Sequence, residues 1–358
     1  MVNNIQVLRA VAALAVVWRH MMQWFQADLG YGLPYVGRAG VDIFFVISGF
    51  IMFHTTQNGG RSTLQFWVDR VIRVGPVYWL ITGVLIVFFY AGLSAGGVVK
   101  FNAGDIAANF LFIPKIRADG DWNPILSTGW TMVFEMYFYF LFGLTFFLRS
   151  QVKALVALAI FFTVAFLMTS RFWLSFTLFR WNQPITFEFV AGGVLALLYR
   201  RPIALSKTSA KLAGISLLVL GAVAFFIVAD LFKEGTAEPT LLRTAVNGPP
   251  AIAVVAGALM LEKHGVVWNS RKLLLLGAAS YSIYCVHLLV IEWGSILWPR
   301  LHLEFPGALP LFCAATYAAA VLAGLVLYFA FEKPVTAFLK SKLGGRRPGA
   351  VRSTAAPA

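Results

Sequence analysis

The sequence predicts an all-α polytopic membrane protein, a bundle of about ten transmembrane helices with both termini in the cytoplasm. Three observations favour this fold class. Hydrophobic residues make up 59% of the 358 residues, and mean hydropathy is +0.78. Charged residues make up only 12%, whereas soluble domains carry about 25%. The apolar residues gather in runs of about twenty, the length of a spanning helix, and not in the shorter alternating segments of a β-barrel.

Ten apolar windows are candidate spans. The windows at 184–199 and 244–262 are the weakest, because the first is short and the second contains Asn247-Gly248-Pro249-Pro250 near its start. In chain order the windows cover residues 5–25, 39–57, 76–96, 125–148, 152–170, 184–199, 210–229, 244–262, 273–293 and 308–330.

Charge predicts the orientation of this bundle. An even number of spans places both termini on one side, and the segments on that side carry about twice as many Lys and Arg as the opposite segments. The positive-inside rule therefore puts the termini in the cytoplasm of a multi-pass protein of the inner (plasma) membrane. The net charge of +14 follows from this topology and from contact with anionic lipid, so nucleic acid need not be a partner.

The predicted domains are a membrane-embedded unit, residues 1–338, and a short basic tail, residues 339–358, which we expect to be disordered. The early apolar run is a first span and not a removed signal peptide, because no cleavage site precedes a hydrophilic domain. Cys285 and Cys313 both lie in apolar runs, and their number and spacing predict neither a disulfide framework nor a metal site.

The longest predicted outer loop, about residues 97–124, contains Asp119-Gly120-Asp121-Trp122-Asn123-Pro124. Its polar and aromatic groups suit a lid or a sugar contact. An interfacial loop anchored by tryptophan is the alternative.

Ionisable residues inside predicted spans are candidates for function, because a charge at that depth is costly. Arg9 and His20 share the first span, and their spacing of eleven residues puts both on one helix face, roughly 16 Å apart along the axis. His287 in the ninth span lies at about the same depth as His20, so the two histidines can share a cavity. A snorkelling arginine and structurally hydrogen-bonded histidines are the alternatives.

Three carboxylates accompany these histidines: Asp42 in the second span, Glu135 in the fourth and Glu188 in the sixth. Together they have the composition of a polar cavity suited to proton transfer or of a proton path in a transporter. Ion pairs that hold the bundle together are the alternative interpretation.

Arg70 and Arg73 lie at the cytoplasmic end of the third span. Their i, i+3 spacing puts them on one helix face, where two guanidinium groups can bind phosphate oxygens in a geometry that lysine lacks. A positive-inside anchor is the alternative.

Several motifs together resemble one family, the acyltransferase family 3 membrane proteins, and within it the exopolysaccharide O-acetyltransferase (ExoZ-type) members. The resemblance covers nearly all of residues 3–335. Any one motif is weak, but all of them occur in order. They are Arg9 with His20, Gly40–Phe50, Arg70-x-x-Arg73, Trp130–Glu135, Ser280–His287 and Phe331-Glu332-Lys333-Pro334.

This resemblance implies transfer of an acyl group, usually acetyl from acetyl-CoA, to a hydroxyl of a cell-surface carbohydrate or lipid-linked saccharide. It implies that His20 is the catalytic base with Arg9 as its motif partner, and that Arg70 and Arg73 contact the acyl-CoA donor. Asp42, Glu135 and His287 fall in family motifs and are further catalytic candidates. A carboxylate such as Asp42 is in position to orient the His20 ring.

The same resemblance implies no permanently bound cofactor, acetyl-CoA being a co-substrate. Polysaccharide-synthesis proteins are possible partners. Some family members carry an additional soluble domain, whereas here only the short tail follows the tenth predicted span.

Two other functions fit parts of the sequence. A transporter or flippase for a polysaccharide precursor suits ten spans and buried acids, but the chain shows no internal repeat. A non-catalytic scaffold for glycan synthesis gives no reason for His20 to lie at bilayer depth.

Overall fold

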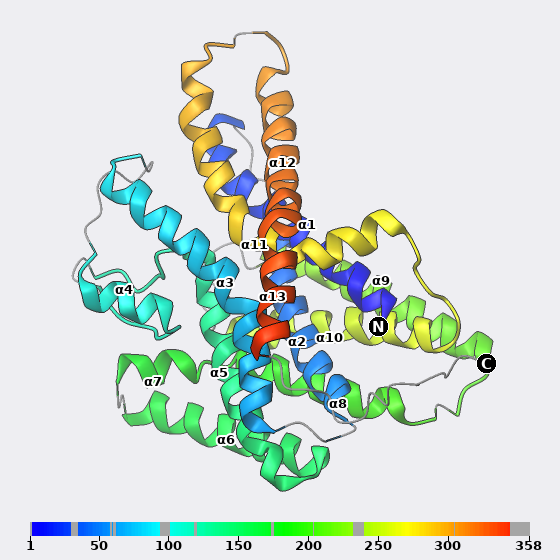
Figure 1. The fold of residues 1–358 in the computed structure, drawn as a ribbon. Coiled ribbons are helices and arrows are strands. Elements are labelled where there is room, and N and C mark those ends of the chain that lie inside the picture. The colour runs from blue at the N-terminus through cyan, green and yellow to red at the C-terminus, as the bar shows by residue number, and fades with distance from the viewer. Residues whose placement is uncertain are drawn as a thin grey trace, which may run out of the picture.

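A computed structural model describes residues 2–29, 35–57, 59, 62–93, 101–117, 120–172, 175–202, 204–231, 240–303 and 305–343. Every regular element within these ranges is helical (Figure 1), which confirms the predicted all-α class there. The long helices are α1 (Asn3–Leu29), α2 (Ala39–Thr55), α3 (Thr63–Tyr90), α5 (Trp130–Leu144), α6 (Gln151–Phe172), α8 (Thr186–Arg200), α9 (Lys207–Leu231), α10 (Leu241–Lys263), α11 (Arg271–Leu297) and α12 (Ala308–Leu327). The shorter elements are η1 (Tyr35–Arg38), α4 (Ala103–Phe110), η2 (Ser127–Gly129), η3 (Thr145–Leu148), α7 (Phe176–Trp181), η4 (Trp298–Arg300), η5 (Tyr328–Glu332) and α13 (Lys333–Leu343).

Each of the ten predicted spans overlaps one of the long helices. In the described part of the chain, eight helical segments are long and apolar enough to cross a membrane, so the protein is a multi-pass membrane protein. The other two, α2 with 17 residues and α8 with 15, are shorter than the roughly twenty residues of a typical span. Ten crossings and cytoplasmic termini therefore stay predictions.

Helix α2 lies in the interior of the bundle, packed against α1, α8 and α10. Its backbone approaches that of α8 closely at two glycines. A Cβ atom added to Gly49 would collide with the backbone of Phe189, and one added to Gly192 would collide with the backbone of Val46 and Phe50. Small residues allow this kind of contact between membrane helices, and here they position α2 for the site described below.

Helices α6 and α9 form part of the periphery. In the most apolar 18-residue stretch of each of these helices, only 22% of the residues are buried within the protein, whereas 61% are buried in the corresponding stretch of α1. Their remaining apolar surface has the composition of a lipid-facing surface.

Helix α3 begins earlier than the sequence predicted. Ser62 caps it, because its hydroxyl accepts from the N–H of Gln65 at 3.2 Å while the Gln65 side chain accepts from the Ser62 N–H at 3.3 Å. The predicted start at residue 76 is wrong, since Pro76 lies inside the helix, as membrane helices allow. Arg70 and Arg73 therefore project from the body of α3.

Helix α10 also starts before its predicted window. Thr240 caps it by accepting from the Arg243 N–H at 3.3 Å, and Pro249 and Pro250 are accommodated within the helix. Arg243, which the predicted topology places in an outer loop, is only 2% exposed.

Residues 308–343 form one continuous rod, α12–η5–α13, drawn from orange to red in Figure 1. Its middle turn, η5, is a π-helix that ends at the buried Glu332, and such turns occur frequently at functional sites. The predicted domain boundary at 338/339 falls within α13, and residues 344–358 lie outside the described residues.

Candidate active site

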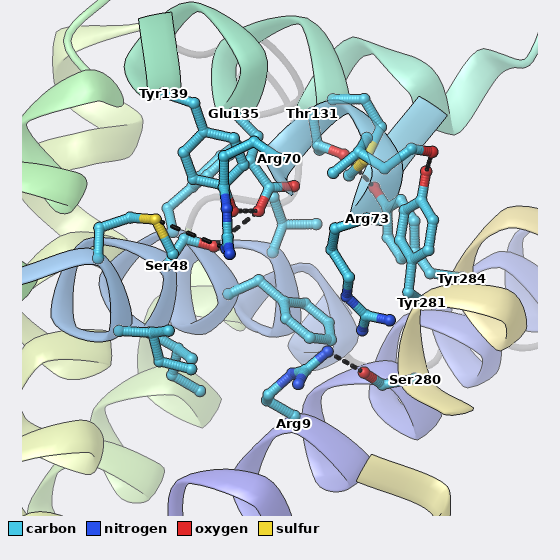
Figure 2. A pocket seen from close by; sticks show the side chains of 18 residues that line it. Arg9, Ser48, Arg70, Arg73, Thr131, Glu135, Tyr139, Ser280, Tyr281 and Tyr284 are labelled. Carbon is cyan, nitrogen blue, oxygen red and sulfur yellow. Dashed lines mark hydrogen bonds between the residues drawn. The ribbon is translucent and has the colours of Figure 1, made fainter. Parts of the chain in front are cut away.

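A cavity of about 120 Å³ lies between α1, α2, α3, α5 and α11 (Figure 2). Its wall is largely apolar and aromatic, with polar groups from all five helices. The lining residues are Arg9, Val41, Phe44, Phe45, Ile47, Ser48, Ile51, Met52, Arg70, Arg73, Val74, Thr131, Met132, Glu135, Tyr139, Ser280, Tyr281 and Tyr284. An apolar cavity with a few convergent polar groups is the usual form of a small-molecule site.

Two arginines of this cavity lack a carboxylate partner in the described part of the chain. Arg9 donates to Ser280 Oγ at 3.0 Å and to Gln6 Oε1 at 3.3 Å. Arg70 contacts the sulfur of Met52 at 3.8 Å, and its guanidinium carbon lies 5.7 Å from the centroid of Tyr139. Both cations are held by neutral groups, so both can bind an anionic ligand.

Arg73 differs from Arg70 although it lines the same cavity. It forms an ion pair with Glu332, whose second carboxylate oxygen accepts from Ser282 Oγ at 2.5 Å. Glu332 is buried at the end of the π turn. Arg70 and Arg73 thus line the same cavity, but of these two only Arg73 forms an ion pair with a carboxylate among the described residues.

Glu135 lies in the wall of the cavity as well (Figure 2). Its Oε1 accepts a hydrogen bond from Ser48 Oγ at 3.0 Å and another from the Tyr139 hydroxyl. These two hydroxyls hold the carboxylate on the α5 side of the cavity.

His20 and His287 meet, as their equal predicted depth suggested. Nδ1 of His20 lies 2.9 Å from Nε2 of His287, and the ring centroids are 5.0 Å apart. Among the described residues, neither ring lines the cavity. Tyr284 does, however, and its ring centroid is 5.8 Å from that of His287. The histidine pair thus lies one aromatic ring beyond the cavity.

The site residues therefore form two groups along α1. Arg9 belongs to the arginine-lined cavity, and His20 belongs to the histidine pair, roughly 16 Å further along the helix axis. Arg9 contacts neither histidine and instead bonds Gln6 and Ser280, so the two members of the Arg9–His20 motif lie in separate groups, as their spacing predicted.

Asp42 does not orient His20. Its two carboxylate oxygens accept from Arg243, at 3.3 Å from Nε and 3.0 Å from Nη2. The side chains are 0% and 3% exposed, and the guanidinium carbon of Arg243 lies 5.4 Å from the centroid of Trp130. The predicted topology gave no sign of this contact, because it places Arg243 in an outer loop.

Glu188 lies near this ion pair and is 1% exposed. Within the described part of the chain, neither of its carboxylate oxygens lies within hydrogen-bond geometry of a partner. The Asp42 side of the bundle is therefore a buried ionic cluster separate from the cavity, in agreement with the bundle-cohesion alternative.

The described part of the outer loop is compact. α4 is capped by Asn102, and Lys115 forms an ion pair with Asp105 at 2.7 Å. Burial opposes the charge of Asp105, but hydrogen bonds from Lys115 and from the Asn102 backbone lower the pKa of this carboxyl below its ordinary value. The guanidinium carbon of Arg180 lies 3.4 Å from the centroid of Trp122. One face of Trp122 is thus covered by the protein itself, and Asp119 lies outside the described residues.

This geometry defines a class of protein. It is a multi-pass helical protein with an arginine-lined cavity and a histidine pair beyond that cavity. Residues 2–327 match the acyltransferase domain family Acyl_transf_3. The chain therefore belongs to acyltransferase family 3 and is an acyltransferase.

Three curated relatives illustrate the range of this similarity. The exopolysaccharide production protein ExoZ of Rhizobium meliloti is 31% identical over 84% of this chain and 90% of its own. The acyltransferase MdmB of Streptomyces mycarofaciens is 26% identical over 95% of this chain and 92% of its own. The peptidoglycan O-acetyltransferase OatA of Listeria monocytogenes is 24% identical over 81% of this chain but only 49% of its own. No solved structure matches the chain.

Proposed function

We propose that this acyltransferase O-acetylates a carbohydrate of the cell envelope, with acetyl-CoA as donor, in the plasma (inner) membrane. The acceptor is a hydroxyl of an exopolysaccharide or of its lipid-linked precursor. Family membership and the names of two relatives, one for exopolysaccharide production and one for peptidoglycan O-acetylation, support this choice.

The observation that carries the proposal is the convergence of Arg9, Arg70 and Arg73 on one cavity. Coenzyme A is anionic at its nucleotide end, and guanidinium groups bind phosphate through paired hydrogen bonds. Arg9 and Arg70 are the primary phosphate contacts, because Arg73 already has Glu332 as a partner. The thioester arm then lies along the apolar wall toward Tyr284 and the histidine pair.

His20 acts as the general base in this proposal. It removes the proton of the acceptor hydroxyl as the oxygen bonds to the thioester carbonyl carbon. The carbon–sulfur bond then breaks, and the coenzyme A thiolate takes the proton from the His20 imidazolium. The products are an acetyl ester and free coenzyme A, and His20 returns to its neutral form. Movement of Tyr284, which lines the cavity and contacts His287, brings the thioester to His20.

Transfer of radiolabelled acetyl groups from acetyl-CoA to the host's purified polysaccharide tests the function, with the protein in proteoliposomes. We expect H20A to lower kcat by about 10²–10⁴, the usual contribution of a general base. Wild-type transfer by H20A would remove His20 from the mechanism. Absence of any acetyl ester with the wild-type protein would favour the flippase alternative.

Donor binding is measured separately by titrating coenzyme A into the purified protein. We expect R9A and R70A each to weaken binding by about 10- to 100-fold, since a hydrogen bond to a charged group contributes about 1.5–3 kcal/mol. R149A is the matched control, because Arg149 is exposed and lines a different hollow. Equal affinities in R70A, R9A and the control would return these arginines to the anchor interpretation.

A further inference from the structure

The two histidines of the pair differ in their surroundings. His287 is 0% exposed, and its Nδ1 lies 3.2 Å from the backbone carbonyl oxygen of Ile283, one turn earlier on α11. Its other nitrogen, Nε2, faces Nδ1 of His20 at 2.9 Å. His20 is only partly buried. Both ring nitrogens of His287 therefore have a hydrogen-bond partner, whereas no partner is recorded among the described residues for Nε2 of His20.

These contacts fix the positions of the protons. A carbonyl oxygen only accepts hydrogen bonds, so the proton shared with Ile283 belongs to Nδ1 of His287. A neutral imidazole carries one N–H, which leaves Nε2 of His287 as an acceptor. The proton between the rings then belongs to Nδ1 of His20, and the lone pair of neutral His20 is on Nε2.

The opposite arrangement requires a doubly protonated His287. That cation would lie fully buried at membrane depth. The contacts recorded for its ring nitrogens are the backbone of Ile283 and of Tyr284 and the ring of His20, and none of these is a carboxylate. An unpaired buried charge costs several kcal/mol. The neutral arrangement is therefore the one that the surroundings stabilise.

We propose that His287 is a positioning residue, which holds the proton of His20 on Nδ1 and so makes Nε2 the atom that takes the acceptor's proton. This inference rests on the proposed role of His20 as the base. When Nε2 receives the hydroxyl proton, Nδ1–H of the resulting imidazolium still donates to His287, which stays neutral. The hydrogen bond that one ring nitrogen makes sets the role of the other. Here the orienting acceptor is a neutral imidazole and not a carboxylate.

Two substitutions at residue 287 separate this role from simple packing. In H287Q the amide oxygen reaches the place of Nε2 and accepts from His20, whereas H287L fills similar space without an acceptor. We expect H287L to lower kcat by at least about tenfold, a part of the general-base contribution, with KM for acetyl-CoA within twofold of wild type. We expect H287Q to recover most of the lost kcat. The unchanged KM follows because the cavity arginines do not contact the pair.

Nitrogen-15 NMR of histidine-labelled protein gives an independent measurement. The chain has five histidines, so H20A and H287Q identify the signals of the pair. We expect wild-type His20 to be protonated at Nδ1 and unprotonated at Nε2. Protonation of neutral His20 at Nε2 would overturn the proposal even if H287L failed to fold.

Kinetics supply the other opposing result. The carbonyl of Val16, one turn before His20, is a second acceptor beside the His20 ring. Wild-type kcat in a folded H287L would mean that this carbonyl is sufficient, and the positioning role would be abandoned. Loss of transfer in H20A together with full transfer in H287L would reject only the role of His287. Full transfer in H20A would reject the proposed base itself.

Discussion

Asp42 and Arg243 form a two-point ion pair between α2 and α10, with both side chains almost fully buried. Removing one member takes away the two-point partner of the other buried charge, and breaking a buried pair in this way typically costs about 3–5 kcal/mol. We therefore expect D42N to lower the free energy of unfolding by about that amount, measured in detergent. The control is D121N, whose carboxylate is 40% exposed in its ion pair with Arg117, where about 0–1 kcal/mol is expected.

The double variant of Asp42→Leu with Arg243→Leu sharpens this test. Replacing a whole buried ion pair by apolar residues is often close to neutral. We expect the double variant to be more stable than D42N. A double variant that is less stable than D42N would show that the ionic contact itself holds α2 to α10.

The contact between α2 and α8 depends on the absence of side chains at Gly49 and Gly192. We expect G49A to lower the free energy of unfolding by about 1–3 kcal/mol, because the new methyl group forces the two backbones apart. Gly83 of α3 is the matched control, since a Cβ there meets nothing within 4 Å. G83A should be neutral or stabilising by up to about 1 kcal/mol. Equal thermal unfolding of the two variants would contradict the close approach.

The helices were predictable from the sequence, because each span needs about twenty apolar residues whatever surrounds it. The residues at which the helices begin and end were harder to predict. Pro76 suggested a helix start, yet Ser62 caps α3 well before it. Pro249 and Pro250 likewise suggested that the helix starts close to them, so neither the first turn of α10 nor the burial of Arg243 in it was predicted. Proline is a weak boundary signal in a membrane helix, because neighbouring helices satisfy the freed carbonyl groups.

The depth of each candidate site residue along its helix could be predicted from the sequence. The direction in which its side chain points from the helix could not. Counting residues along spans gave the meeting of His20 and His287, since rise per residue is constant. It did not show that Arg9 lines the same cavity as Arg70, or that Arg73 pairs with Glu332, which is 259 residues away in sequence. Those contacts depend on which helices are neighbours, and apolar runs carry no such information. Glu332 was within a recognised motif, so it was a missed candidate.

Glu332 should contribute to the stability of the fold through its ion pair with Arg73. We expect E332Q to lower the free energy of unfolding by about 1–3 kcal/mol, because Arg73 loses its anionic partner in a partly buried position. E332Q combined with R73Q should lose less than the sum of the two single changes. Lys333, the next residue, is exposed, so K333Q should stay within about 0.5 kcal/mol of wild type. Additive losses from E332Q and R73Q would mean that the pair contributes no coupling.

Labelling with a membrane-impermeant thiol reagent decides whether α2 and α8 cross the membrane. Cys285 and Cys313 are only 1% and 4% exposed, so new cysteines report with little background. Ile116 in the loop after α4 is 48% exposed, and Ser341 of α13 is exposed. If all ten predicted spans cross, Ile116 follows three crossings and Ser341 follows ten, so the two residues lie on opposite sides. We then expect I116C to react in intact spheroplasts and S341C to react only after lysis.

If α2 and α8 do not cross, both residues follow an even number of crossings, and both cysteines should require lysis. Since short central helices can be accommodated by local thinning of the bilayer, we expect the first result.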